Sequence, residues 1–245
     1  MADNIKDIPA EIETAESYAL GKQVYQQLLQ QIIRLQLKPN EKINIAQLAS
    51  DMDISRTPIR SAIERLVEDG LVEQISDRSY MVSPVSMLDC VDLCDARKIL
   101  EGNAAYMASN NIKTPDIEIL ERSIDDAKAC IEKNDPDGFA DYDALFHETL
   151  LKAADNHYLW TVYETIKTRM NRYRYLISYY GRQTADRDTH HALSKHLCIL
   201  RAVKNRYSSV AQSEMEEHIQ YTYRTLFELA RFIEQDYNAK TNRED

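Results

Sequence analysis

Residues 51–71 read Asp-Met-Asp-Ile-Ser-Arg-Thr-Pro-Ile-Arg-Ser-Ala-Ile-Glu-Arg-Leu-Val-Glu-Asp-Gly-Leu, and this stretch guides the interpretation of everything N-terminal to about residue 85. Ser55 can cap a helix by accepting from backbone amides one turn further in. Pro58 still falls within the first turn, where its missing N–H removes no internal hydrogen bond. The helix should therefore begin at about Arg56. Apolar residues then recur at helical spacing and can face a core: Ile59, Ala62, Ile63, Leu66 and Val67.

The flanking segments predict a helix before this one and a hairpin after it. Upstream, apolar residues at helical spacing follow Asn44, a residue suited to capping a helix. Downstream, Asp69-Gly70 offers a left-handed stop. Two short apolar runs, 71–75 and 80–82, then flank the polar segment 76–79. Helix, turn, helix and hairpin in this order predict a winged helix-turn-helix. The outward, N-terminal end of its second helix, which such a fold presents to base edges, carries Ser55, Arg56, Thr57 and Arg60.

Composition limits the class of protein. The chain has 245 residues, 44% of them hydrophobic, and only 5 Gly and 6 Pro, which favours long helices joined by few loops. It has no uncharged apolar run of about 18 residues, so we expect no transmembrane segment. The first residues lack the basic start and apolar core of a signal peptide. The four cysteines form no disulfide framework, which favours a reducing, cytoplasmic location.

The net charge of −10 is an objection to nucleic-acid binding, because contacts to phosphate supply most of the non-specific affinity. The positions of the basic residues are more informative here than the net charge of the whole chain. Four arginines fall on the expected reading surface and its wing, and a symmetric dimer would double their number: Arg56, Arg60, Arg65 and Arg78. The acidic excess elsewhere would limit unspecific adhesion to DNA.

The segment Ser83-Pro-Val-Ser86 interrupts the pattern, and we place a domain boundary there, between a DNA-binding domain over residues 1–83 and a second domain over 84–245. Beyond it only helical patterns occur. Caps and prolines divide them into six helices, which predict an all-α bundle and a mainly α protein overall. The first, third and fifth of these helices are expected at about 87–109, 136–154 and 188–204. The second starts at 114, the fourth runs from 156 or 157 to about 181, and the sixth runs from 208 or 209 to about 237.

A group of ionisable residues recurs on buried faces of this second domain. Asp143 and His147 lie four residues apart and therefore project from one face of a helix. His196 and His218 lie among apolar residues of two later helices. Unpartnered polar groups are costly there, so these side chains should have a common partner. Three imidazoles and one carboxylate could converge on a divalent cation. Each histidine alone would more often be an ordinary hydrogen-bonded residue.

The segments Ser55–Arg60, Ala62–Leu66 and Gly70–Val72 resemble the DNA-binding domain of the GntR family of bacterial transcription regulators, over about residues 16–83. The resemblance implies a homodimer that binds double-stranded operator DNA, with contacts from Arg56, Thr57 and Arg60. The wing of that family usually carries an Arg-Gly pair, whereas this chain has Arg78-Ser79. Ser79 adopts fewer backbone conformations than glycine, so the contact from Arg78 is the less secure part of the comparison.

The second domain resembles the all-helical effector domain, called FCD, of the FadR-type subgroup, through Asp143–His147, Ala153–Asn156, Lys195-His196 and Glu217–Ile219. The resemblance implies that Asp143, His147, His196 and His218 bind a divalent metal ion, for which zinc is the first choice and nickel or manganese are alternatives. It also implies a small carboxylate effector beside the metal. His157, His190 and His191 do not match and are read as cap, loop or surface residues.

Arg97 matches an arginine of the subgroup that would hold the effector, although a simple Arg97–Glu101 pair at helical spacing explains it equally well. Arg172 and Arg174 are further candidates. Cys90 and Cys94 share a helical face and could bind a soft metal, but packing explains them better. The expected function is thus an effector-modulated transcription regulator. A metal-dependent hydrolase of helical type is the alternative, because a His/Asp site can activate water, although no further general base stands out.

Overall fold

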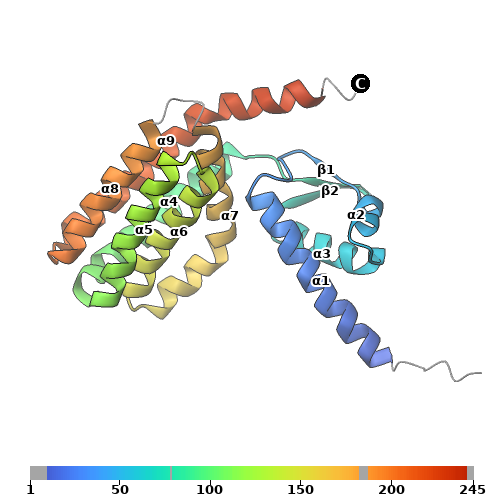
Figure 1. Ribbon diagram of the computed structural model, residues 1–245, viewed down its shortest axis with the longest axis horizontal. Helices are drawn as coiled ribbons and strands as arrows, with labels where there is room; N and C mark the ends of the chain where they lie inside the picture. The colour runs from blue at the N-terminus through green and yellow to red at the C-terminus, as the bar shows by residue number, and fades with distance from the viewer. Residues whose placement is uncertain (1–9, 78, 182–186, 242–245) are drawn as a thin grey trace, which may run out of the picture. The chain divides into compact units, whose positions relative to one another are not determined.

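The computed structural model describes residues 10–77, 79–181 and 187–241. The chain divides into two compact units, Met1–Val85 and Ser86–Asp245 (Figure 1). Each unit has its own core. We describe them separately.

The first unit combines three helices with a small antiparallel sheet (Figure 1). The sheet order is β1-β3-β2, in which Lys42 pairs with Met81 and Val72 pairs with Val82. The apolar side chains of α1 and α3 form the core, with Leu28, Ile32 and Ile63 fully buried. The elements are α1 (Ala10–Ile33), β1 (Lys42–Ile43), α2 (Ile45–Asp51), α3 (Arg56–Glu68), β2 (Val72–Ser76) and β3 (Ser79–Val82).

The helix-turn-helix is formed by α2 and α3, largely as the sequence predicts. The side chain of Asn44 caps α2 by accepting from the amides of Ala46 and Gln47. Helix α3 begins at Arg56, and Gly70 follows it with φ 71°, a left-handed conformation that suits glycine. One detail of the prediction is wrong. Ser55 occupies the N-cap position with an extended backbone, but its side chain makes no capping hydrogen bond.

Two other features of this unit differ from the expectation. The helical spacing of apolar residues predicts a first helix from Glu16 to Leu35, whereas α1 begins at Ala10 and ends at Ile33. Strand β1 was not expected, because two residues are too few to show the alternation that identifies a strand. It pairs with the inner strand β3, so the wing hairpin is joined to the segment that precedes α2.

Tyr25 ties α1 to the end of α3. Its hydroxyl donates to Asp69 Oδ2 at 2.6 Å, and the Arg65 guanidinium lies 4.3 Å from the centre of its ring. Burial and the hydrogen bond to the Asp69 carboxylate raise the pKa of Tyr25 to about 12. The folded unit therefore favours the neutral phenol.

We expect the stability of this unit to fall as the pH rises from about 10 to about 12. A phenol whose pKa is raised by folding contributes its full stabilisation below the unfolded pKa and loses it as the pH passes the folded pKa. Tyr25→Phe should lower the free energy of unfolding by about 1 kcal/mol near pH 8, because only the hydrogen bond is removed, and should flatten this alkaline loss. Urea unfolding of both proteins at pH 8 and pH 11 measures it. An equally steep loss in the variant would contradict the assignment.

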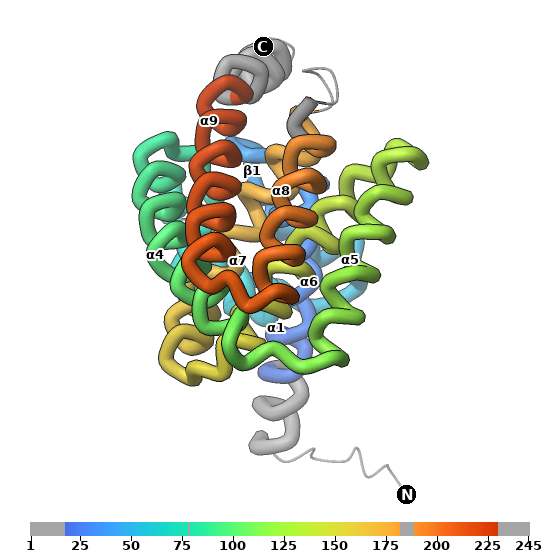
Figure 2. Tube along the Cα trace, turned by 90° about the vertical axis from the view of Figure 1, so that its left-hand side faces the viewer, coloured from blue at the N-terminus to red at the C-terminus, as the bar shows by residue number. Residues whose placement is uncertain are grey.

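The second unit is entirely helical over its described residues. Helix α9 packs along α4 and α8, and α6 packs against α4, α5 and α7, as Figures 1 and 2 also show. The prediction of a mainly α chain, with a winged helix-turn-helix followed by a six-helix bundle, is confirmed. The helices are α4 (Met87–Asn111), α5 (Thr114–Glu132), α6 (Pro136–Ala153), α7 (His157–Gly181), α8 (Arg187–Lys204) and α9 (Ser208–Thr241).

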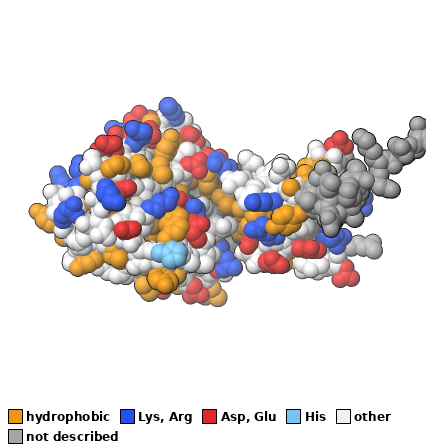
Figure 3. Space-filling view, turned by 90° about the horizontal axis from the view of Figure 1, so that it is seen from below, with side chains coloured by type: hydrophobic (Ala, Val, Ile, Leu, Met, Phe, Trp, Pro, Cys, Tyr) orange, Lys and Arg blue, Asp and Glu red, His pale blue; other side chains and the backbone are white. Residues whose placement is uncertain are grey.

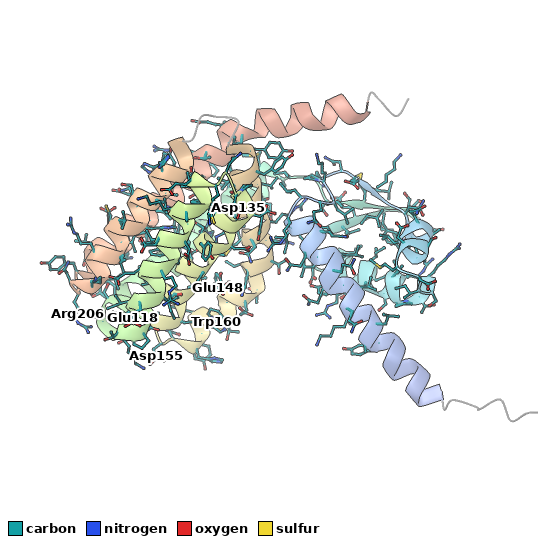
Figure 4. All side chains as sticks on the ribbon, in the orientation of Figure 1. Glu118, Asp135, Glu148, Asp155, Trp160 and Arg206 are labelled. Atoms are coloured by element: carbon teal, nitrogen blue, oxygen red, sulfur yellow. The ribbon has the colours of Figure 1, made fainter. Side chains whose placement is uncertain are left out.

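Local sequence signals set the starts of these helices. Ser86 accepts from the amide of Asp89 at the start of α4. Asp135, labelled in Figure 4, accepts from the amide of Gly138 and is followed by Pro136 at the first position of α6. Asn156 accepts from the amides of Tyr158 and Leu159 before α7. Over the described residues, no helix has both the length and the apolar character that crossing a membrane requires.

Candidate functional site: a recognition helix and a buried histidine cluster

The N-terminal end of α3 presents polar side chains to solvent. Ser55, Arg56, Thr57 and Arg60 are exposed, while Pro58 and Ile59, on another face of the same turns, are buried. Arg65, included in the expected reading surface, instead lies over the ring of Tyr25 and is held against α1. Arg78 lies outside the described residues.

The second site is a cluster of four side chains from three helices. Asp143 and His147 project from one face of α6, His196 comes from α8 and His218 comes from α9. The three imidazoles are 1–2% exposed and the Asp143 side chain is 13% exposed. Their candidate ligand atoms all lie within 4.8 Å of one another, and no other such group of three or more occurs in the described parts of the chain.

The three imidazoles direct the same nitrogen toward a common centre. His218 Nε2 lies 3.2 Å from His147 Nε2 and 3.3 Å from His196 Nε2. Asp143 completes the group, with Oδ1 at 3.4 Å from His196 Nε2 and Oδ2 at 3.8 Å from His147 Nε2. Phe146 stacks on His196 with ring centres 4.1 Å apart and restricts that ring. His218 Nδ1 is buried and has no hydrogen-bond partner.

Two ion pairs surround the cluster. Arg174, from α7, donates through Nε to Asp143 Oδ2 at 2.8 Å and through Nη1 to Asn171, while its buried Nη2 has no hydrogen-bond partner. Arg97, from α4, donates to Glu101 Oε1 at 2.7 Å, and the other oxygen of Glu101 contacts His147 Nδ1. The formal charges of the two carboxylates and the two guanidiniums balance.

Burial and these charges set the protonation of the cluster. Burial lowers the pKa of His196 to about 3, against the opposing effect of Asp143. Burial, with the neighbouring imidazoles, holds the pKa of His218 well below its usual value. Burial alone would raise the pKa of Asp143, but His147, His196 and Arg174 outweigh it and the pKa is lowered. Neutral imidazole and ionised carboxylate are the forms that bind a metal ion.

The residues fit a divalent metal ion. Two neutral imidazoles that face each other through Nε2 gain at most one hydrogen bond. His218 Nε2 faces two such nitrogens, at 3.2 and 3.3 Å, so lone pairs stay unmatched unless a cation lies between the rings. Ligands held about 2.0–2.1 Å from a tetrahedral Zn²⁺ are about 3.3–3.4 Å apart. The two Nε2 separations and the shorter Asp143 distance come close to this spacing.

A cavity of about 40 Å³ adjoins the cluster. Both Arg97 and Arg174 line it, together with Asp143, His218 and hydroxyl-bearing residues of α9. Arg172, the other arginine suggested from the sequence, is not among the lining residues. Arg97 both pairs with Glu101 and lines the cavity. A structural role and a role in holding the effector are therefore compatible for this residue.

Sequence reasoning missed the role of Glu101 and could not choose Arg174. Glu101 was considered only as the partner of Arg97, four residues earlier on α4. Its second contact is with His147 on α6. No local sequence pattern shows how α6 packs against α4. The available signal was an acidic residue at helical spacing from Ala104, Ala105 and Ala108, small apolar residues on the same face of α4.

The remaining histidines and cysteines lie apart from this site. His157 and His190 are exposed, and His191 stacks on Tyr221 at 3.7 Å. Cys90 and Cys94 are buried free thiols on one face of α4. They belong to no group of three or more closely spaced metal-ligand residues in the described regions.

Comparisons with known proteins agree with this architecture. Residues 20–82 match the family described as "Bacterial regulatory proteins, gntR family", and residues 92–221, more than half of the chain, match the "FCD domain". The chain is 25% identical over 201 residues to the HTH-type transcriptional repressor RspR of Escherichia coli (strain K12), covering 82% of this chain and 86% of that protein. It is 21% identical over 204 residues to the gluconate operon transcriptional repressor of Bacillus subtilis (strain 168), covering 82% of each.

Solved structures show the same fold. "E. coli McbR/YncC" has a TM-score of 0.69 at 20% identity, covering 89% of this chain and 98% of that one. A structure of a GntR transcriptional regulator from Rhodococcus sp. RHA1 has a TM-score of 0.67 at 19% identity, covering 84% of this chain and 97% of that one. RspR and the gluconate operon repressor are named as regulators of transcription, and they give no support to the hydrolase alternative. The chain therefore belongs to the GntR family, in the subgroup with an FCD domain, and is a DNA-binding transcription regulator rather than an enzyme.

Proposed function

We propose that this regulator senses a small organic acid through a divalent metal ion, and that binding of the acid changes its affinity for operator DNA. The observation that carries the proposal is the convergence of three buried Nε2 atoms and one carboxylate from α6, α8 and α9. Zinc suits this set of His and Asp ligands, with nickel or manganese as alternatives. Asp143, His147, His196 and His218 would hold the ion.

The charges around the cluster favour an anionic effector. The carboxylates of Glu101 and Asp143 balance the guanidiniums of Arg97 and Arg174, so a divalent ion leaves an excess of about two positive charges in a buried place. A bound carboxylate would reduce that excess. The ion would supply a coordination site for one carboxylate oxygen, and Arg174 Nη2 is a buried donor with no other partner.

Binding of the acid must also move protein atoms. A cavity of about 40 Å³ is far smaller than the pockets of roughly 300–1,000 Å³ that hold small organic ligands in proteins. An organic acid of several carbons therefore requires displacement of lining residues, which include Thr189 and Ala192 of α8 and Thr222 of α9. Such a ligand favours the conformation with the larger cavity, and this difference in affinity is what can couple it to DNA binding.

On the DNA side, we propose that α3 reads the operator from its exposed N-terminal end. Arg56 or Arg60 would pair with guanine, and Ser55 and Thr57 would contact phosphate or a thymine methyl group, with Arg78 contributing from the wing. Acidic and basic side chains are interspersed on the face drawn in Figure 3. Because the chain as a whole carries a net charge of −10, the attraction to phosphate must come from the arginines of α3 and the wing.

We further propose a homodimer that acts in the cytoplasm as a repressor. One recognition helix reads too few base pairs for an operator, whereas two can occupy half-sites one helical turn apart. Helix α4 exposes three apolar residues, Leu88, Ile99 and Tyr106. Ile99 lies about three helical turns after Leu88, and Tyr106 lies about two turns after Ile99, so the three form one apolar stripe that a second copy of the chain could cover. Repression is suggested by the names of RspR and the gluconate operon repressor.

Fluorescence anisotropy with a duplex from the chain's own promoter tests the proposal. The metal-loaded protein should bind the duplex, and one member of a panel of organic acids should change the dissociation constant about 5–150-fold. The metal-free protein should bind DNA without responding to the acid. A response to the acid that is equal with and without metal would exclude the metal-dependent part of the proposal.

Arg174→Lys should weaken the effector about tenfold or more while leaving metal affinity within a few fold. Lysine keeps the positive charge beside Asp143 but cannot donate through a planar fork to both Asp143 and a bound carboxylate. Arg169→Lys is the matched control, because Arg169 lies on the same helix and pairs with Asp89 at the surface. Calorimetric titration of the acid into each metal-loaded protein measures the difference. Equal weakening in the two variants would remove Arg174 from the effector site.

A further inference from the structure

Glu101 connects a wall of the cavity to the histidine cluster. Its side chain is 1% exposed, and its two oxygens have different partners: Oε1 accepts from Arg97 Nε at 2.7 Å, and Oε2 contacts His147 Nδ1. A carboxylate needed only to neutralise Arg97 could use both oxygens for that guanidinium. Here one oxygen is directed away from Arg97, onto an imidazole of α6.

This contact fixes which nitrogen of His147 carries the proton. A carboxylate accepts hydrogen bonds, so Nδ1 of His147 must be the N–H donor, and the lone pair of the neutral ring is then on Nε2. Nε2 is the atom that faces His218 at 3.2 Å and Asp143 at 3.8 Å. The ring is thereby held in the tautomer and orientation that a metal ligand requires.

We propose that Glu101 is a positioning residue for metal binding, which acts through His147 by holding that imidazole in one tautomer and one orientation. The inference rests on the proposed metal site and extends it to a residue that does not itself touch the ion. His218 provides the contrast, because no carboxylate of the described residues contacts its Nδ1, whereas Glu101 Oε2 contacts Nδ1 of His147. Mutation of a residue that contacts the other nitrogen of a metal-binding histidine typically lowers metal affinity 10–100-fold.

Glu101→Gln tests the proposal, because glutamine keeps the shape of the side chain but removes the charge that both partners share. We expect the dissociation constant for Zn²⁺, measured by competition with a chromophoric chelator, to rise 10–100-fold. Glu148→Gln is the matched control. Glu148, labelled in Figure 4, follows His147 directly on α6 and also loses a partly buried carboxylate, but its partners are Tyr163 and Lys167, away from the cluster.

A second readout separates positioning from a loss of stability. The visible absorption of bound Co²⁺ reports the ligand geometry, and we expect its bands to shift in Glu101→Gln and not in Glu148→Gln. If Glu101→Gln fails to fold because Arg97 is left buried without its counter-ion, the double variant Arg97→Gln/Glu101→Gln removes both charges. The double variant should also bind Zn²⁺ 10–100-fold more weakly.

The outcomes separate this inference from the proposal beneath it. Wild-type protein that binds neither Zn²⁺ nor Co²⁺ would overturn both. Wild-type protein that binds metal, with Glu101→Gln or the foldable double variant binding it equally well and with the same Co²⁺ spectrum, would overturn the role of Glu101 alone.

Discussion

Replacing Arg60 by alanine is expected to weaken binding to the operator about 30-fold or more and to relax base preference at one position of each half-site. Arg60 is exposed at the N-terminal end of α3, one turn beyond Arg56, while buried Ile59 and Ile63 anchor the neighbouring face of the helix in the core. A bidentate contact from arginine to guanine contributes about 1–3 kcal/mol, and a dimer makes it twice. Removing it should therefore cost about 2–6 kcal/mol of binding free energy.

Arg65→Ala is the matched control for this experiment. Arg65 lies two turns from the start of the same helix and carries the same charge, but it is held over the Tyr25 ring. Its loss should lower affinity slightly for all sequences, through the general attraction to phosphate, without changing base preference. Anisotropy measured on the operator and on single-base variants of it distinguishes the two effects. Binding by Arg60→Ala that is unchanged at every position would exclude Arg60 from base recognition.

The DNA-binding unit was predictable because its information is local. A helix start at Arg56, a glycine stop and an apolar stripe all lie within about 20 residues, and each acts on the backbone near it. One of the two errors is local and the other is not. Ser55 can cap or can face outward, and the sequence does not distinguish the two. Strand β1 exists only because β3, some 40 residues later, pairs with it.

The candidate metal residues could be named from spacing and resemblance, but their surroundings could not. Asp143 and His147 share a face by helix geometry alone. The approach of His196 and His218 to them depends on how α8 and α9 pack on α6, and the contacts of Arg174 and Glu101 depend on α7 and α4. Helix packing follows from side-chain shape over the whole bundle, which a single helix does not reveal.

His218→Ala is expected to reduce metal affinity more than a hundredfold and to abolish the response to the effector, while operator binding persists. His218 is central to the cluster, with Nε2 at 3.2 Å from His147 and 3.3 Å from His196. Losing a metal ligand should weaken metal binding by more than the 10–100-fold that is typical when a hydrogen-bond partner of a ligand is lost. The fold should survive, because the buried Nδ1 of His218 has no hydrogen bond to lose and the remaining cost is that of a small cavity.

Thermal unfolding with and without Zn²⁺ measures the first part of this prediction. A ligand at a hundredfold excess over its dissociation constant stabilises the folded state by about 2.7 kcal/mol, so wild-type protein should show a clear increase in melting temperature and His218→Ala should show none. His191→Ala is the control, because His191 stacks on Tyr221 outside the cluster and should leave the increase intact. If His218→Ala still responds to the acid in the DNA-binding assay, then the acid acts without the metal, and the buried cluster is structural.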